Sequence, residues 1–432
     1  MGRIIGLLVL IGGLISSSAM AQDTQKLRGM WVDVFHDGIK TPNQVEQLMS
    51  RARKARVNTL FIQVRSRAQV YHMSLLEPRA LDAMPLFDGL KHVILMAHAQ
   101  DPPIQVHAWI NAHPLWETKS DPPWKDHVLF KHKDWLTQDP KGNTSTEVGR
   151  ALDFGHPLAA DYLTRLYKEV AENYNVDGVH LDFIRFTGKE WGYNPVSVER
   201  FYESLQTSQR EQVLVRSRAA GYTKPATRAA NSRESFFPGA EKTGAEYAAE
   251  GLPATNDPLW NEWRRKQVTN LVAKVSKAVK EIKPKIVVSV AAIPWGDAPN
   301  DFTQSAAYAR CFQDWKGWAQ DGIVDLVLPM LYFRESSHAS YFRNWVSYCN
   351  ALKPKAKSHI AAGIGNWLNS PTQTMTQSRI ADAKLDGVCY FSYASTNPFP
   401  GKEAQLFNPE FYAAIGALPL AKPLGPITVV SE

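Results

Sequence analysis

Short apolar runs alternate with longer amphipathic segments along most of the chain. The runs are rich in β-branched and aromatic residues, and each is followed by a polar loop and a segment in which apolar residues recur every three or four positions. The runs predict eight strands, over residues 28–34, 59–65, 104–111, 178–186, 286–292, 325–332, 359–365 and 387–393. The periodic segments predict helices, including those over residues 41–55, 157–174, 257–282, 305–321 and 341–352. Thr41-Pro42 and Asp257-Pro258 are helix-start signals.

Eight strands that are each followed by a helix predict a (β/α)8 TIM barrel, an α/β fold. A doubly wound open sheet is the alternative, but it has fewer strands and usually carries a glycine-rich phosphate turn after the first strand. No GxGxxG sequence occurs in the chain. We expect one barrel over residues 22–418, a long insertion over its active-site face at residues 187–256, and an extended tail at residues 419–432.

Polar side chains gather on one face of the predicted strands and toward their carboxyl ends. In the fourth strand, His180 and Asp182 alternate with Val179 and Leu181. Alternation places one set inside the barrel and the other against the helices. An interior built only for stability would be filled with Val, Ile and Leu, whereas barrel enzymes place their chemistry at the C-terminal ends of strands. We therefore expect the polar set to point inward and the functional site to lie at that end.

Composition narrows the class of protein. Of the 432 residues, 44% are hydrophobic and 21% are charged. These fractions are typical of folded globular proteins rather than of disordered chains. Its net charge of +7 comes from scattered residues without a run of five or six basic positions, which gives no indication of a nucleic-acid partner. Cys311, Cys349 and Cys389 are too few for a disulfide framework or a four-cysteine zinc site. We expect buried free thiols, with one disulfide as the alternative, and a monomeric protein.

The first 21 residues have the pattern of a secretory signal peptide. Arg3 precedes an apolar run over residues 4–15, and Ala-Met-Ala at positions 19–21 matches a cleavage site of small residues. A retained membrane anchor is the alternative, but the run is shorter than the roughly 20 residues needed to span a bilayer. We expect cleavage before Gln22 and a secreted or periplasmic protein with no stable membrane insertion afterwards.

Several motifs, in order, resemble those of the family-10-like glycoside hydrolases. They are RGMWVDV, NTLFIQVR, HAWIN, VDGVHLDFIRF, FQDWKGWAQDGIVD and LPMLYFRE, and the resemblance spans about residues 27–415. It implies an exported (β/α)8 barrel that acts on glycans, and one bacterial branch of the family cleaves peptidoglycan sugar strands. The family's fourth-strand motif typically reads His-Leu-Asp, then Asp or Tyr, then Arg-Tyr-Pro. This chain has HLDFIRF at residues 180–186, which keeps Asp182 but has Phe where the family can have a second, adjacent Asp. In the sixth strand, it has Leu331 where many relatives carry Asn or Gln.

Glycoside hydrolysis needs an acid to protonate the leaving oxygen and a carboxylate that acts as base or nucleophile. Asp182, at the end of the fourth strand, is the first candidate, and capping of the following helix is its alternative role. Glu335, just past the sixth strand, is the preferred second carboxylate. A structural role in a surface ion pair is the alternative interpretation of Glu335. Asp33 and Asp297 are the alternatives for that second carboxylate.

Other residues near the strand ends are candidates for binding sugar. Arg65 and Arg185 would bind anionic substituents or hold Asp182 ionised. His107 and His180 are expected to form hydrogen bonds in the wall of the site, and aromatic rings around one mouth suit stacking on sugar rings. The candidate substrate-binding residues are Asp33, Arg65, His107, Trp109, Asn111, His180, Arg185, Trp295, Tyr332, Trp367 and Tyr393.

No motif indicates a cofactor or a metal ion. Metal-dependent hydrolase barrels commonly carry His-x-His on the first strand, where this chain has Trp31-Val32-Asp33, and the HExxH and GxSxG motifs are absent. Together with the glycan-acting enzyme that the resemblance implies, the absence of these motifs predicts a metal-independent glycoside hydrolase that acts on a polysaccharide or oligosaccharide. A non-catalytic glycan-binding barrel, which would keep the aromatic residues and lose the carboxylates, is the alternative.

Overall fold

The structure is a computed structural model that describes residues 25–222, 242–394 and 406–426. The predicted signal peptide, part of the predicted insertion and the last residues of the predicted tail lie outside these ranges.

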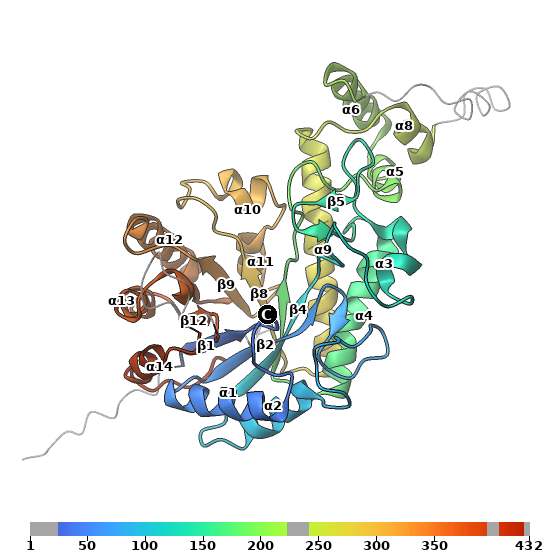
Figure 1. Cartoon of the computed structure of the whole chain (residues 1–432). Coiled ribbons are helices and arrows are strands. Elements are labelled where there is room, and N and C mark those ends of the chain that lie inside the picture. The colour runs from blue at the N-terminus through green and yellow to red at the C-terminus, as the bar shows by residue number, and fades with distance from the viewer. Residues whose placement is uncertain (1–24, 223–241, 395–405, 427–432) are drawn as a thin grey trace, which may run out of the picture.

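Eight parallel strands close into a TIM barrel surrounded by helices, which confirms the predicted fold (Figure 1). The first strand pairs with both the second and the last, so the ring has no open edge. In chain order the strands are β1 (Leu27–Val32), β2 (Thr59–Ser66), β4 (Gln105–Asn111), β7 (Gly178–Asp182), β8 (Val287–Ala292), β9 (Leu326–Leu331), the short β10 (His359–Ile360) with β11 (Ala362–Gly365), and β12 (Gly387–Phe391).

Two of the helices that cover the barrel begin at the start signals that the sequence predicted. Thr41 accepts a hydrogen bond from the backbone N–H of Gln44, and Asp257 accepts from those of Leu259 and Trp260. The helices of the outer layer are α1 (Pro42–Lys54), α2 (Gly89–His98), α4 (Pro157–Asn173), α9 (Pro258–Ile282), α11 (Trp315–Asp321), α12 (Ala339–Leu352), α13 (Pro371–Asp382) and α14 (Pro409–Gly416).

The helix predicted over residues 305–321 is wrong in its middle. The segment forms α10 (Ala306–Ala309) and α11 (Trp315–Asp321), separated by an irregular stretch. Phe312 has a φ of +55°, which no right-handed helix accepts. The buried side chain of Gln313 binds the backbone of β8 and its following loop instead, with Nε2 donating to the carbonyl of Ala291. Helical periodicity did not reveal this tertiary contact.

The side chains of the strands alternate as predicted. Val179 and Leu181 belong to the large apolar layer between strands and helices. The barrel interior holds a second apolar cluster that includes Trp31, Phe61 and Trp109. The predicted tail contributes to this interior cluster, because Leu424 is buried in it.

The insertion forms a helical unit with its own apolar core. Its helices are α5 (Pro195–Glu203), α6 (Thr207–Ala219) and α8 (Gly244–Glu250), which pack with the start of α9 around Phe201 and Trp260. In Figure 1 this unit projects beyond the end of α9. None of its described residues lines the cavity at the barrel mouth, so its position over the active-site face stays a prediction.

The three cysteines are buried and free, as predicted. Burial raises the pKa of the Cys311 thiol to about 11, so it stays protonated at neutral pH. Among the described helices, none is both long and apolar enough to cross a membrane.

Candidate active site

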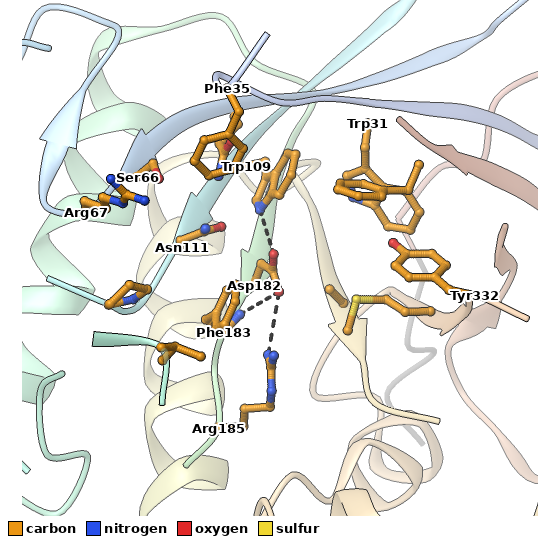
Figure 2. A pocket seen from close by; sticks show the side chains of 16 residues that line it. Trp31, Phe35, Ser66, Arg67, Trp109, Asn111, Asp182, Phe183, Arg185 and Tyr332 are labelled. Carbon is orange, nitrogen blue, oxygen red and sulfur yellow. Dashed lines mark hydrogen bonds and ion pairs between the residues drawn. The ribbon is translucent and has the colours of Figure 1, made fainter. Parts of the chain in front are cut away.

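A cavity of about 300 Å³ opens at the C-terminal ends of the barrel strands (Figure 2). Most of the strands contribute a side chain to it, so its shape depends on barrel closure. The residues that line it are Trp31, Phe35, Gln63, Ser66, Arg67, Trp109, Asn111, Pro114, Val148, Asp182, Phe183, Arg185, Ala291, Met330, Tyr332 and Phe391.

Asp182 faces this cavity from the end of β7 (Figure 2). Its Oδ2 accepts a hydrogen bond from Trp109 Nε1 at 3.1 Å, and its Oδ1 accepts one from the backbone N–H of Phe183 at 2.6 Å. Arg185 Nη1 lies 3.7 Å from Oδ1. Burial raises the pKa of Asp182, and Arg185 and the two hydrogen bonds oppose that rise. A raised pKa increases the protonated fraction of a carboxyl group, which suits it to proton transfer.

A sharp turn holds the carboxyl group and its partners together. The predicted strand over residues 178–186 ends early, at Asp182, because Phe183 has a φ of +52° and leaves the extended conformation. This left-handed conformation is costly for a residue with a Cβ atom and occurs at functional sites more often than elsewhere. The Arg185 guanidinium lies 4.4 Å from the centroid of the Phe183 ring. The turn therefore positions the acid, one hydrogen-bond donor and one cation.

His180 and His107 lie in the barrel interior and do not line the cavity. His180 Nε2 accepts a hydrogen bond from Trp31 Nε1 at 3.0 Å, and its Nδ1 lies 2.9 Å from Ser289 Oγ. Since the indole can only donate, Nδ1 carries the imidazole proton. Burial lowers the pKa of His180 well below its usual value and that of His107 to about 4. Both rings are therefore neutral at pH 7, and His180 orients Trp31.

The two arginines predicted for the site have different surroundings. Arg65 is buried, and its Nε and Nη2 bind the carboxylate oxygens of Glu77 at 2.7 and 2.6 Å. A bulge in β2 between Gln63 and Arg65 places Arg65 beside Ile110, which faces the helices. The structure therefore does not bring Arg65 into the cavity, whereas Arg185 lines it.

Arg67 lines the cavity and is not among the residues that the sequence predicted. It lies in the turn immediately after β2. Turn residues belong to neither face of a strand, so alternation carries no signal for them. Ser66 and Gln63 also line the cavity without having been predicted.

Glu335 lies in the loop after β9, outside the lining of the cavity. Its Oε1 accepts a hydrogen bond from Arg343 at 2.6 Å, and its Oε2 accepts one from Gln377 at 3.2 Å. These contacts connect the loop to α12 and α13. The structure does not bring Glu335 together with Asp182.

The other candidates for a second carboxylate also lie outside the lining. Asp33 Oδ1 accepts from the backbone N–H groups of the second and third residues after it, at 3.0 and 3.2 Å. Asp297 accepts from Asn344 Nδ2 at 3.0 and 3.1 Å. Among the described residues, Asp182 is the carboxylate that lines the cavity. In the same part of the chain, no group of three His, Cys, Asp or Glu side chains is placed to hold a metal ion.

The sequence model of the glycosyl hydrolase-like 10 family matches residues 26–223 and 234–377. The chain belongs to this family. The resemblance inferred from the ordered motifs is thereby confirmed. Glycosyl hydrolase DigH of Escherichia coli K12 is 24% identical over 387 residues, which cover 79% of this chain and 74% of DigH. Glycosyl hydrolase YngK of Bacillus subtilis is 22% identical over 351 residues, which cover 75% of this chain and 57% of YngK.

Solved structures share the barrel of this glycosyl hydrolase-like 10 protein. The PgaB (BpsB) glycoside hydrolase domain from Bordetella bronchiseptica has a TM-score of 0.53 and 13% identity, and the match covers 86% of this chain and 94% of that domain. A GH42 β-galactosidase from G. stearothermophilus has a TM-score of 0.57 and 13% identity, with 91% of this chain and 56% of that chain covered. These similarities show the fold.

Aromatic rings surround the carboxyl group in this glycosyl hydrolase-like 10 barrel. Trp109 and Tyr332 were predicted and line the cavity, and Tyr332 stacks on Phe391 with ring centroids 5.4 Å apart. Trp31 and Phe391 were not predicted, although they follow the same inward alternation as Trp109. The aromatic residues that line the cavity are Trp31, Phe35, Trp109, Phe183, Tyr332 and Phe391.

The other predicted aromatic residues lie elsewhere in this family member. Trp295 and Trp367 are 45% and 37% exposed and do not line the cavity. Tyr393 is buried, and its hydroxyl accepts a hydrogen bond from Arg51 at 2.6 Å. Proximity to a strand end in the sequence thus did not suffice to place these rings.

Proposed function

We propose that this protein is an exported, metal-independent glycoside hydrolase that cleaves the sugar strands of a cell-wall polysaccharide such as peptidoglycan. The observation that carries this proposal is the buried carboxyl group of Asp182, which has a raised pKa and faces an aromatic-lined cavity at the end of a barrel strand. Membership of a glycosyl hydrolase-like family supports the class of reaction. The signal-peptide pattern of the first 21 residues supports export.

Asp182 acts as the general acid in this proposal. The bond between the anomeric carbon and the leaving sugar breaks while the oxygen of a water molecule bonds to that carbon and releases a proton to solvent. In the same step, the protonated carboxyl group of Asp182 donates its proton to the glycosidic oxygen of the leaving sugar. The resulting carboxylate is stabilised by Trp109 Nε1–H, by the N–H of Phe183 and by Arg185. These contacts favour the charged form of Asp182, which develops in the transition state, so they lower the activation barrier.

Buried amide groups in the wall of the cavity are available to sugar hydroxyls. Gln63 Nε2 and Asn111 Oδ1 are buried and have no hydrogen-bond partner among the described residues. Buried polar groups without a partner are costly unless a ligand or water satisfies them. The faces of Trp109 and Tyr332 provide apolar surface for the sugar ring.

The decisive experiment compares Asp182→Asn with the unaltered protein. The substitution keeps size and most hydrogen bonding but removes ionisation, so we expect a near-normal melting temperature and persistent glycan binding. Turnover, measured as released reducing ends from peptidoglycan strands, should fall by about two to four orders of magnitude. Hydrolysis by the unaltered protein should be the same with and without EDTA.

Asp325→Asn is the matched control. Asp325 is also buried, but it lies at the start of β9, at the opposite end of the barrel, where Lys280 donates to it at 2.9 Å. We expect this control to lose stability and to keep its turnover per folded molecule. A stable Asp182→Asn protein with near-normal turnover would refute the proposed role of Asp182. Binding without any turnover by the unaltered protein would favour a non-catalytic glycan-binding barrel.

A further inference from the structure

The cavity around Asp182 continues into a second cavity along the barrel mouth. The second cavity has a volume of about 440 Å³ and shares Phe35, Ser66 and Arg67 with the first. Its other walls include Trp116 and Trp124. Because the two cavities have walls in common, they can hold neighbouring sugars of one glycan strand.

Five charged side chains line the two cavities. Asp182 and Arg185 form one pair at 3.7 Å, and Lys40 and Asp82 form another at 2.6 Å. Arg67 is the fifth, and its guanidinium makes no hydrogen bond or ion pair with a described residue. The junction of the cavities therefore carries one uncompensated positive charge on a partly buried side chain.

A tight turn fixes Arg67 at this junction. Arg67 and Ala68 connect β2 to the antiparallel strand β3 (Gln69–Val70), and their φ angles are +55° and +51°. Two-residue turns with positive φ at both positions favour Asn-Gly, and here neither residue is Asn or Gly. Ala68 is fully buried, and His127 Nε2 lies 3.2 Å from the carbonyl oxygen of Arg67. The fold thus holds an arginine in a conformation that arginine does not favour.

We propose that Arg67 binds a carboxylate on the sugar next to the one held at Asp182, which makes the substrate an acidic glycan. A guanidinium binds a carboxylate through two parallel hydrogen bonds, and the pair is stronger in a partly buried site than in open water. The carboxylate is that of a uronic acid or that of the lactyl ether of a muramic acid. This inference rests on the proposed function and names the substrate class of the same site.

Binding measurements on the Asp182→Asn protein test this inference without consuming the glycan. The probes are peptide-free peptidoglycan strands and oligogalacturonate, each compared with a form in which the carboxyl groups are reduced to alcohols. We expect one acidic probe to bind about tenfold tighter, or more, than its reduced form. Adding Arg67→Gln should abolish this preference and leave binding of the reduced form within about twofold. The probe that shows the preference identifies the source of the carboxylate.

Arg56→Gln is the matched control, because Arg56 is an exposed arginine with a φ of +50° that precedes β2 at the opposite end of the barrel. It should leave the preference intact, and Arg67→Lys should retain part of it. Any of three results would overturn the inference. They are equal affinity for the acidic and reduced glycans, no binding of either acidic probe, and a preference for the acidic probe that survives Arg67→Gln. Arg67-dependent binding in a protein that cleaves no glycan would overturn the proposed function and leave this inference standing.

Discussion

Asp182 and Arg185 form a charged pair in which burial and charge act in opposite directions. Burial raises the pKa of Asp182, and the cation 3.7 Å away lowers it. The same cation stabilises the carboxylate that remains after proton transfer. Arg185 therefore affects both the pH range in which Asp182 is protonated and the barrier of the step in which it loses its proton.

Arg185→Met should change the pH profile as well as the rate. Removal of the cation raises the pKa of Asp182 further, so Asp182 stays protonated to higher pH. The pH at which kcat declines on the alkaline side should therefore increase. The maximal rate should fall at least about tenfold, because a buried charge loses its partner. The profile of kcat against pH, measured together with the melting temperature, checks both effects.

Arg185→Lys retains the charge and provides the control. We expect its alkaline limb to lie between those of the unaltered protein and Arg185→Met. If Arg185→Met lowered kcat equally at every pH, Arg185 would have no influence on the pKa of Asp182.

The closure of the barrel depends on a close approach between β1 and β12. Gly387 pairs with Leu27, has a φ of +123°, and a Cβ atom there would lie 2.1 Å from the backbone oxygen of Leu27. A backbone atom in a closed sheet cannot move aside without breaking the pairing. This one position therefore requires glycine for both steric and conformational reasons.

Gly387→Ala should lower the free energy of unfolding by about 3 kcal/mol or more. Gly221→Ala is the control, because Gly221 also has a positive φ, +75°, but has open space where a Cβ atom would lie. The control should cost only about 1 kcal/mol. Urea denaturation of both variants measures the difference, and equal losses would show that the contact with β1 is unimportant.

At the scale of the whole molecule, the barrel and the helical insertion have separate apolar cores. The barrel carries the cavity, and the described part of the insertion does not line it. A proposed cell-wall substrate also requires the molecule to leave the cytoplasm. The N-terminal segment is the part of the chain that would direct this export.

Expression with the native N-terminus in a bacterial host should yield an exported protein that begins within a residue or two of Gln22. N-terminal sequencing of the exported fraction measures this start. Ala21→Leu should block cleavage, because signal peptidases require a small residue at that position. A membrane-retained protein with an intact N-terminus would contradict the prediction.

The sequence determined the fold, because strand and helix periodicity is a local property of the chain. Eight apolar runs with intervening amphipathic segments predicted the TIM barrel, and alternation predicted that Asp182 points inward. Ordered motifs predicted the family. Trp109 and Tyr332 were predicted from their positions near strand ends, and both line the cavity.

The composition of the cavity was decided only by the tertiary structure. One bulge in β2 turns Arg65 toward Glu77, and the turn after it brings Arg67 to the mouth instead. Glu335 contacts a residue of the next helix, Arg343, rather than the cavity. A one-residue irregularity or a single ion pair with the next element changes the direction of a side chain without changing the periodicity. The local pattern therefore determines which elements form, and their packing determines which residues meet.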